Sequence, residues 1–310
     1  MLQGISFTPF AHPDMLATLS LARRSCLVIA LIALPMTLSA QGAAQPARTP
    51  RADSLTRANQ LDVDGKTSEA RAIFSALISS APDAAAKVAA QRSMVISYAF
   101  DGDCANAAKV ADMAVAYYKT REQSDPQNAF NTQGEIANEA ARACIDAGNP
   151  DVALTYYMMG TKLANGEPEP RTHPKSLWSF RAHHAMGRVA ARKGNRAEAL
   201  QHIEMARKSL DSDTAMARSQ RRFLPYLEGY VDLYTNELAG AQKHLTETLA
   251  IAGNERDPFF TYLVAMTHEK MGHAAVAKEW YQKSYDLATG HTLPSAFVRP
   301  NARKKLAGTP

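Results

Sequence analysis

Small and apolar residues recur along the chain with helical spacing, in pairs of segments separated by a turn residue. The clearest case is residues 181–206, which break at Gly194-Asn195. Residues three or four apart share one face of a helix, and a glycine after the last periodic residue is a typical helix stop. The spacing therefore predicts two short helices that touch through small side chains. These small residues are Gly187, Ala190, Ala191, Ala199 and Ala206.

The same unit recurs six times between residues 54 and 290. The expected turn residues are Gly65, Gly102, Gly148, Gly194, Asn236 and Gly272. In the second helix of each unit, one small residue takes an equivalent place: Ala70, Ala107, Ala153, Ala199, Ala241 and Ala277. The intervals between these alanines are 37, 46, 46, 42 and 36 residues. The recurrence predicts an all-α protein, since nothing in the pattern has the period of a strand.

These units resemble the tetratricopeptide repeat, in which a Gly turn precedes an Ala, an aromatic residue and a second Ala down the second helix. The aromatic position is Ala111, Ile203 or Leu245 in three of the units, and Thr248 replaces the second Ala in the fifth. The family repeats every 34 residues or so, and we therefore expect longer helices or loops in the middle units. The resemblance implies an α-solenoid of about six stacked helix-turn-helix repeats in a right-handed superhelix.

The chain divides into four expected regions. Residues 1–40 are predicted to be a signal peptide, 41–53 a flexible leader, 54–290 the solenoid, and 291–310 a C-terminal capping tail. In the tail, Leu293, Phe297 and Leu306 are expected to cover the last hairpin. Pro294 and Pro300 are expected to break any helix there, because proline lacks the backbone donor.

The first region has the order of a secretory signal. Arg23 and Arg24 precede an apolar run at 26–38, and small residues then offer cleavage near Ala40. The run is too short to span a bilayer comfortably. A general secretory signal is favoured over a twin-arginine signal, and Met15 is an alternative start to Met1. We expect an exported protein, periplasmic or secreted, with no transmembrane span in the mature chain.

The amino-acid composition and the distribution of charge argue against some classes of binding partner. Hydrophobic residues make up 46% of the 310 residues, enough for a substantial core. The formal net charge of +5 comes from 35 basic and 30 acidic residues that are interspersed, with no long basic run. This pattern and the predicted export disfavour nucleic acid as the partner.

In this family, ligands lie on the concave face, which the first helix of each repeat lines. Counting back from the equivalent alanines places a basic band in the third and fourth repeats and an aromatic band in the fifth and sixth. Our first hypothesis is a non-catalytic scaffold that binds a peptide or partner protein, of acidic character, through arginine forks and rigid rings. The competing interpretation is packing aromatics and a solvated arginine face. The predicted groove residues are Asn138, Arg142, Arg181, His184, Arg188, Arg192, Tyr226, Tyr230 and Tyr234.

Two further hypotheses stay open. A helical-repeat enzyme or glycan-binding protein could use the basic band as a substrate site. A deep closed pocket joining its arginines and His184 to a carboxylate would favour that reading, whereas an open groove favours the scaffold. The solenoid could also self-associate through the aromatic band, if that band is exposed.

Motifs for catalysis and metal binding are near misses. The segment from His268 to His273, HEKMGH, has one residue more than the zinc-protease HExxH, and residues five apart are expected on different faces of a helix. We therefore predict no catalytic residue, metal or cofactor. Cys104 and Cys144 fall at the same end of neighbouring helices, which permits a disulfide in an exported protein; two free buried thiols are the alternative.

Overall fold

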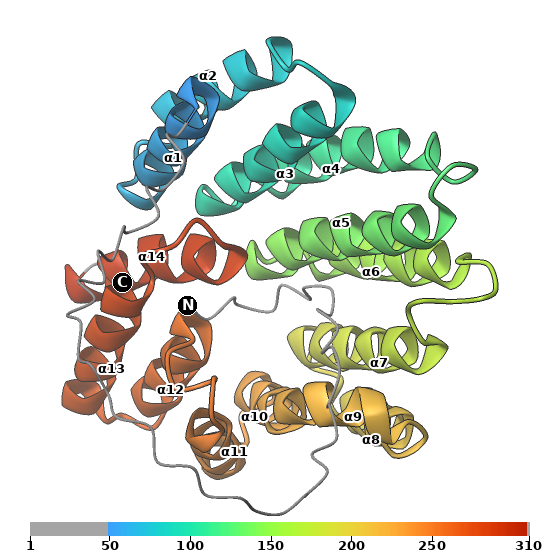
Figure 1. Cartoon of the computed structure of the whole chain (residues 1–310). Coiled ribbons are helices and arrows are strands. Elements are labelled where there is room, and N and C mark those ends of the chain that lie inside the picture. Colours follow the sequence, from blue (N-terminus) through green and yellow to red (C-terminus); the bar gives the residue numbers. More distant parts are fainter. Residues whose placement is uncertain (1–48, 309–310) are drawn as a thin grey trace, which may run out of the picture.

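The computed structural model describes residues 49–308, and within that range every regular element is a helix (Figure 1). The predicted signal peptide and its cleavage site near Ala40 lie outside the described residues. The elements are α1 Pro50–Val63, α2 Thr67–Ser79, α3 Ala84–Phe100, α4 Cys104–Lys119, α5 Pro126–Asp146, α6 Pro150–Asn165, α7 Lys175–Arg192, α8 Arg196–Asp211, α9 Thr214–Gln220, the 3-10 helix η1 Arg221–Phe223, α10 Leu224–Tyr234, α11 Leu238–Ala250, α12 Pro258–Lys270, α13 Ala274–Leu287 and α14 Leu293–Leu306.

The all-α fold class is confirmed, and the helices pack as successive hairpins. The pairs are α1–α2, α3–α4, α5–α6, α7–α8, α10–α11 and α12–α13, and each pair packs on the next. All six expected turn residues have positive φ, including Asn236 at 65°, and no other non-glycine residue among those described does so. A left-handed residue after the last helical turn reverses the chain, and this explains why glycine or asparagine stands at each of these positions.

Burial follows the repeat pattern. Each of the six equivalent alanines is at most 3% exposed. The residues that follow them at helical spacing, such as Tyr157 and Gly160 in α6, are buried as well. A single hairpin cannot bury its apolar stripe, so the stacking of neighbours supplies the core. This arrangement is compatible with a helical-repeat solenoid.

Helices α5 and α6 approach each other closely inside their hairpin. A Cβ atom built on Gly134 would be 2.7 Å from the Cβ of Ala164 and 2.8 Å from the carbonyl oxygen of Gly160. Real Cβ atoms do not come so close to their neighbours, so both glycines are needed for this contact. The hairpin that carries one wall of the candidate site is thereby held tightly together.

The long intervals have two causes. The first is helix length, since α5 has 21 residues and α7 has 18. The second is an insertion, because α9 and η1 lie between α8 and α10. The middle repeats thus have both the longer helices and the longer connection that the sequence predicts.

At the N-terminal end, helix α1 begins inside the predicted leader. Thr49 accepts a hydrogen bond from the backbone of Ala52, and Pro50 occupies the first turn, where no backbone donor is required. Residues 50–53 are thus helical.

The C-terminal tail differs from the prediction. Helix α14 is continuous from Leu293 to Leu306, so the expected breaks at Pro294 and Pro300 are wrong. Pro294 lies in the first turn, and Pro300 lies inside a helix that is packed against α13 and α12 as well as α3. Tertiary packing on several sides here outweighs the helix penalty of one proline.

Helix α14 bridges the two ends of the solenoid. The hairpins follow an arc from α1 around to α13, and α14 lies between the last pair and the first helices (Figure 1). Phe297 packs on Phe259 and Tyr262 of the last hairpin, with ring centroids 5.3 Å apart in both cases. At the other end, His291 lies 2.8 Å from the buried carboxylate of Asp62. The tail therefore closes the molecule into a ring, beyond covering the last hairpin.

Among the described helices, none combines the length and the apolar character that crossing a membrane requires.

Candidate ligand-binding cavity

A cavity of about 310 Å³ lies on the inner side of the ring. Helices α3, α5, α6 and α7 supply most of its wall, η1 adds one residue, and the chain entering α14 covers it. Its lining residues are Ile96, Glu135, Asn138, Glu139, Arg142, Tyr157, Phe180, Arg181, His184, Ala185, Arg188, Phe223, His291, Thr292, Leu293 and Pro294. The size is that of a small-molecule site.

Helix α5 contributes one polar stripe. Glu135, Asn138, Glu139 and Arg142 are spaced three or four residues apart, so the helix repeat brings them to one face. The Arg142 guanidinium pairs with Asp146 one turn further on and lies 4.0 Å over the ring of Phe259. Asparagine and charged residues on this inner face are unusual for a core position and indicate a site.

Helix α7 contributes a second polar stripe, made of Arg181, His184 and Arg188. Arg181 lies 3.7 Å from the Glu135 carboxylate, measured between Nη2 and Oε1, and 4.5 Å over the Trp178 ring. Burial lowers the pKa of Arg181 to about 10, which keeps the guanidinium charged at neutral pH, and nearby Glu135 opposes that shift. The pKa of Glu135 is raised by its burial, against the opposing effect of Arg181.

Arg188 is the buried cation without a counter-ion. It is only 6% exposed, and within the described residues no carboxylate lies within 4.0 Å of it. Its guanidinium donates to two neutral hydroxyls, that of Tyr157 at 2.9 Å and that of Tyr226 at 3.4 Å. The Nε atom is buried and has no hydrogen-bond partner. A charge removed from water without a counter-ion is costly, so this arrangement favours an anionic ligand.

Two of the three arginines that line the cavity have a carboxylate partner. Arg142 pairs with Asp146 and Arg181 with Glu135, while Arg92 behind the wall pairs with Glu139. The lining residue His291 meets the buried carboxylate of Asp62. A single negative charge on a ligand would balance Arg188.

His184 lies beside the arginines. Burial holds its pKa well below the usual value, and the positive charges of Arg188 and Arg142 lower it further. The imidazole is thus neutral at physiological pH. Its Nε2 atom is buried and has no hydrogen-bond partner. The ring packs against Tyr226, with centroids 5.2 Å apart.

Five of the nine predicted groove residues line this cavity: Asn138, Arg142, Arg181, His184 and Arg188. Arg192, Tyr226, Tyr230 and Tyr234 do not. Tyr226 and Tyr230 are fully buried and form a layer behind the arginines, since they accept hydrogen bonds from Arg188 and Arg192 at 3.4 Å each. Arg192 also lies 4.8 Å over the ring of Tyr234.

The aromatic band is therefore part of the interior. Tyr226 packs on Phe260 with centroids 4.7 Å apart, and Phe297 of α14 covers Phe259 and Tyr262. The hypothesis of self-association through this band required exposed rings, and the structure does not provide them. The reason is α14, whose position the repeat pattern does not predict.

Several lining residues were not among the predicted groove residues. Glu139 and Phe180 lie on the same helices as predicted residues and could have been found by extending the helical stripe. Tyr157 stands at the aromatic position of a second helix, where the repeat pattern indicates core packing, although its hydroxyl also meets Arg188. Residues 291–294 fall in the predicted capping tail, but their place at the cavity depends on the docking of α14 and was not predicted.

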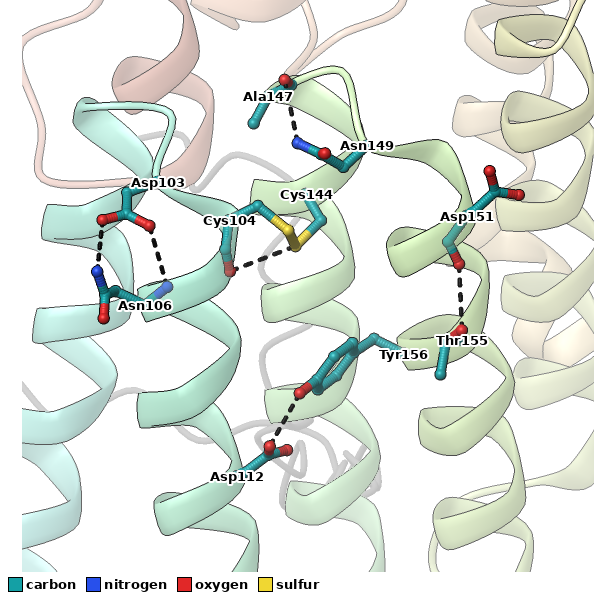
Figure 2. Close-up of a disulfide and its surroundings, with 10 residues drawn as sticks. All are labelled: Asp103, Cys104, Asn106, Asp112, Cys144, Ala147, Asn149, Asp151, Thr155 and Tyr156. Atoms are coloured by element: carbon teal, nitrogen blue, oxygen red, sulfur yellow. Dashed lines mark hydrogen bonds between the residues drawn. A yellow bond between two sulfur atoms is a disulfide. The ribbon is translucent and has the colours of Figure 1, made fainter.

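The two cysteines form a disulfide, with Cα atoms 4.6 Å apart (Figure 2). Cys104 is the first residue of α4, and Asp103 before it caps that helix by accepting from the backbone of Asn106. Cys144 lies near the end of α5, two residues after Arg142. The bridge ties α4 to the helix that carries one wall of the cavity, and it excludes the alternative of two free thiols in this structure.

The two histidines of the HEKMGH segment lie closer together than the sequence predicts. His268 and His273 were expected on different faces, but their Nδ1 atoms are 3.4 Å apart. Helix α12 ends at Lys270, and Gly272 turns the chain back, which brings the second ring beside the first. Among the described residues, no group of three or more His, Cys, Asp or Glu side chains could hold a metal ion.

The chain matches no family model, and no curated protein matches it at the significance required.

Proposed function

We propose that this chain is an exported, non-catalytic binding protein of tetratricopeptide type, and that it holds an anionic ligand in the cavity between α5 and α7. The observation that carries the proposal is Arg188, a buried guanidinium at the cavity wall whose hydrogen-bond partners among the described residues are neutral tyrosine hydroxyls. A ligand carboxylate would supply the missing charge through charge-assisted hydrogen bonds. Oxidised Cys104 and Cys144 are in keeping with export.

The cavity joins the predicted basic band to the Glu135 carboxylate, the arrangement that was to favour a substrate or glycan site over an open scaffold groove. The position of α14 likewise favours an enclosed ligand over a partner protein. Residues 291–294 lie over the cavity, and α14 packs against α3 and α5 on the inner side. A peptide or folded partner would have to displace this helix. A small molecule fits the space that is left.

Calorimetric titration with small carboxylates tests the proposal. We expect wild-type protein to bind at least one of them, and Arg188→Met to lose that binding at unchanged helicity. Arg221→Met is the matched control, since Arg221 is exposed, pairs with Asp211 and does not line the cavity. Equal affinity in wild type and Arg188→Met would contradict the site. The enzyme hypothesis requires turnover of the ligand. Recovery of the ligand unaltered after long incubation would show binding without turnover.

The scaffold hypothesis is kept as a second proposal on one observation: the concave face already accommodates a helix, α14. A peptide partner would take the place of that helix. Pull-down from the exported fraction with wild type and with Arg299→Ala, which weakens the α14 contacts to Val63 and Ala288, tests this idea. A partner enriched by the variant supports displacement; identical partners for both proteins contradict it.

A further inference from the structure

Among the described residues, three buried polar atoms on side chains of the cavity wall have no hydrogen-bond partner. They are Nη2 of Arg142, Nε of Arg188 and Nε2 of His184, and each of these residues is 6% exposed. Buried polar groups in proteins are nearly always satisfied by the protein, by water or by a ligand. Three such atoms at one cavity therefore describe the polar groups that a ligand should offer.

The two arginine atoms are donors, but the histidine atom is an acceptor. The His184 ring is hydrogen-bonded to the backbone of Phe223, and this contact favours the protonated ring, as a carbonyl acceptor does. Since Nε2 has no partner, the donating atom is Nδ1. A neutral imidazole that carries its proton on Nδ1 presents a lone pair at Nε2. This atom requires a donor from the ligand.

The acceptor on His184 and the cation of Arg188 lie next to each other on α7. His184 and Arg188 are four residues apart on α7, which places their Cβ atoms about 5–6 Å apart on the same helix face. A ligand that meets both must carry a hydrogen-bond donor close to its anionic group. A hydroxyl on the carbon beside a carboxylate has that spacing.

The remaining lining is largely apolar. Ile96, Phe180 and Phe223 face the cavity from the solenoid, and Leu293 and Pro294 cover it from the start of α14. Arg142 and Arg181 already have carboxylate partners, so Arg188 calls for one negative charge on the ligand. The rest of the ligand is then uncharged and apolar.

From these groups we infer that the ligand is a hydroxy monocarboxylate with an apolar remainder. Its carboxylate accepts from Arg142 and Arg188, its neighbouring hydroxyl donates to Nε2 of His184, and its apolar part lies against Phe180, Leu293 and Pro294. This inference rests on the proposed function, and it adds the class of anion and the role of His184.

A matched series of six-carbon probes tests the inference: 2-hydroxyhexanoate, hexanoate, hexanedioate and hexyl phosphate, titrated at pH 7.5. We expect 2-hydroxyhexanoate to bind about tenfold tighter than hexanoate, because hexanoate leaves the His184 acceptor unsatisfied. Two buffers of different ionisation enthalpy should give the same binding enthalpy, since no proton is taken up.

Variants of the two adjacent histidines isolate the hydroxyl contact. His184→Phe should bind both monocarboxylates with equal affinity, and His184→Gln, whose side chain retains an acceptor, should restore the preference for the hydroxy acid. His183→Phe is the control, because His183 contacts His202 and does not line the cavity. It should keep the wild-type preference.

The possible negative results of these titrations distinguish the inference from the proposed function. Tightest binding of hexanedioate or hexyl phosphate, equal binding of the two monocarboxylates by wild type, or proton uptake on binding would overturn the inference and leave the anion site in place. No binding of any probe, in a protein shown to be folded, would overturn both the inference and the proposed function.

Discussion

Arg142 and Arg188 lie at the wall of one cavity and are equally buried, but only Arg142 has a carboxylate partner among the described residues. Arg142 pairs with Asp146, whose side chain is itself 9% exposed, and stacks on Phe259. Arg188 has tyrosine hydroxyls where Arg142 has a carboxylate. Substituting each by a similarly long apolar residue should thus have different consequences for the stability of the folded protein.

The first prediction compares Arg188→Met with Arg142→Met. Removing Arg188 relieves a buried unpaired charge and costs two hydrogen bonds, so the free energy of unfolding should change by no more than about 1 kcal/mol. Removing Arg142 leaves Asp146 buried and unpaired, which should cost about 3 kcal/mol. Urea unfolding followed by circular dichroism measures both values. A large loss of stability in Arg188→Met would show that Arg188 is chiefly a structural residue.

The second prediction concerns pH and His184. Its pKa is lowered in the folded protein, so between the unfolded value near 6.5 and the folded value the unfolded chain binds more protons. The stability that the protein gains from keeping His184 neutral is fully present above pH 6.5. It is lost on acidification, by up to about 1.4 kcal/mol per pH unit. His184→Gln should remove this part of the slope between pH 6.5 and 5. Parallel stability curves for the two proteins would contradict the assignment.

At the scale of helices, the site depends on how closely α5 approaches its neighbours. Gly134 and Gly160 let α5 and α6 touch, and the Cys104–Cys144 bridge holds α5 to α4. Helix α5 is therefore the most constrained element of the cavity wall, fixed by packing on one side and by a covalent bond near its end.

The third prediction is that Gly134→Ala destabilises the protein, although alanine is the better helix former. The added methyl would lie 2.7 Å from Trp178 and from Ala164, and such overpacking should cost about 2 kcal/mol. Asn128→Ala, at an exposed position of the same helix, is the control and should change stability by less than about 1 kcal/mol. Thermal unfolding of the two variants decides the matter; a stabilised Gly134→Ala would mean that propensity outweighs packing here.

The fourth prediction is that reduction of the disulfide loosens the third repeat. The bridge closes a segment with a sequence separation of 40, and its loss should lower the free energy of unfolding by about 4 kcal/mol. Cys104→Ala with Cys144→Ala should reproduce the effect of a reductant, and the reductant should then have no further effect on that variant. If reductant leaves wild-type stability unchanged, the thiols are not bridged in solution.

At the scale of the whole molecule, local and distant contacts differ in how well sequence predicts them. The hairpins follow from periodicity and turn residues, because each turn such as Gly194 or Asn236 acts on its own neighbours. The second-helix stripes were predictable for the same reason. Five of the proposed groove residues reached one cavity because helical spacing also orders the inner face.

The closure of the ring was not predictable in this way. His291 meets Asp62 across 229 residues, and Arg299 meets Val63 across 236. No periodic pattern encodes such a pairing. The tail was expected to cover the last hairpin, and Phe297 does so. Its contacts with α1 and α3 were not expected, and they place the start of α14 at the cavity.

The last prediction is that α14 controls the release of the ligand. Residues 291–294 lie over the cavity, and the guanidinium of Arg299 holds the helix to α1 and to the end of α13 through the carbonyls of Val63 and Ala288. Arg299→Ala removes these charge-assisted bonds. Local opening of α14 should then become easier by about 2 kcal/mol, or about thirtyfold.

The consequence should be visible in two measurements made together. Backbone hydrogen exchange in α1 and α14 should accelerate, and the dissociation rate of a bound carboxylate should rise by a similar factor, because the ligand leaves through the opened end. Lys304→Ala, on the exposed face of the same helix, is the control for both. Faster exchange with an unchanged dissociation rate would mean that the ligand leaves by another route and that α14 only fastens the ring.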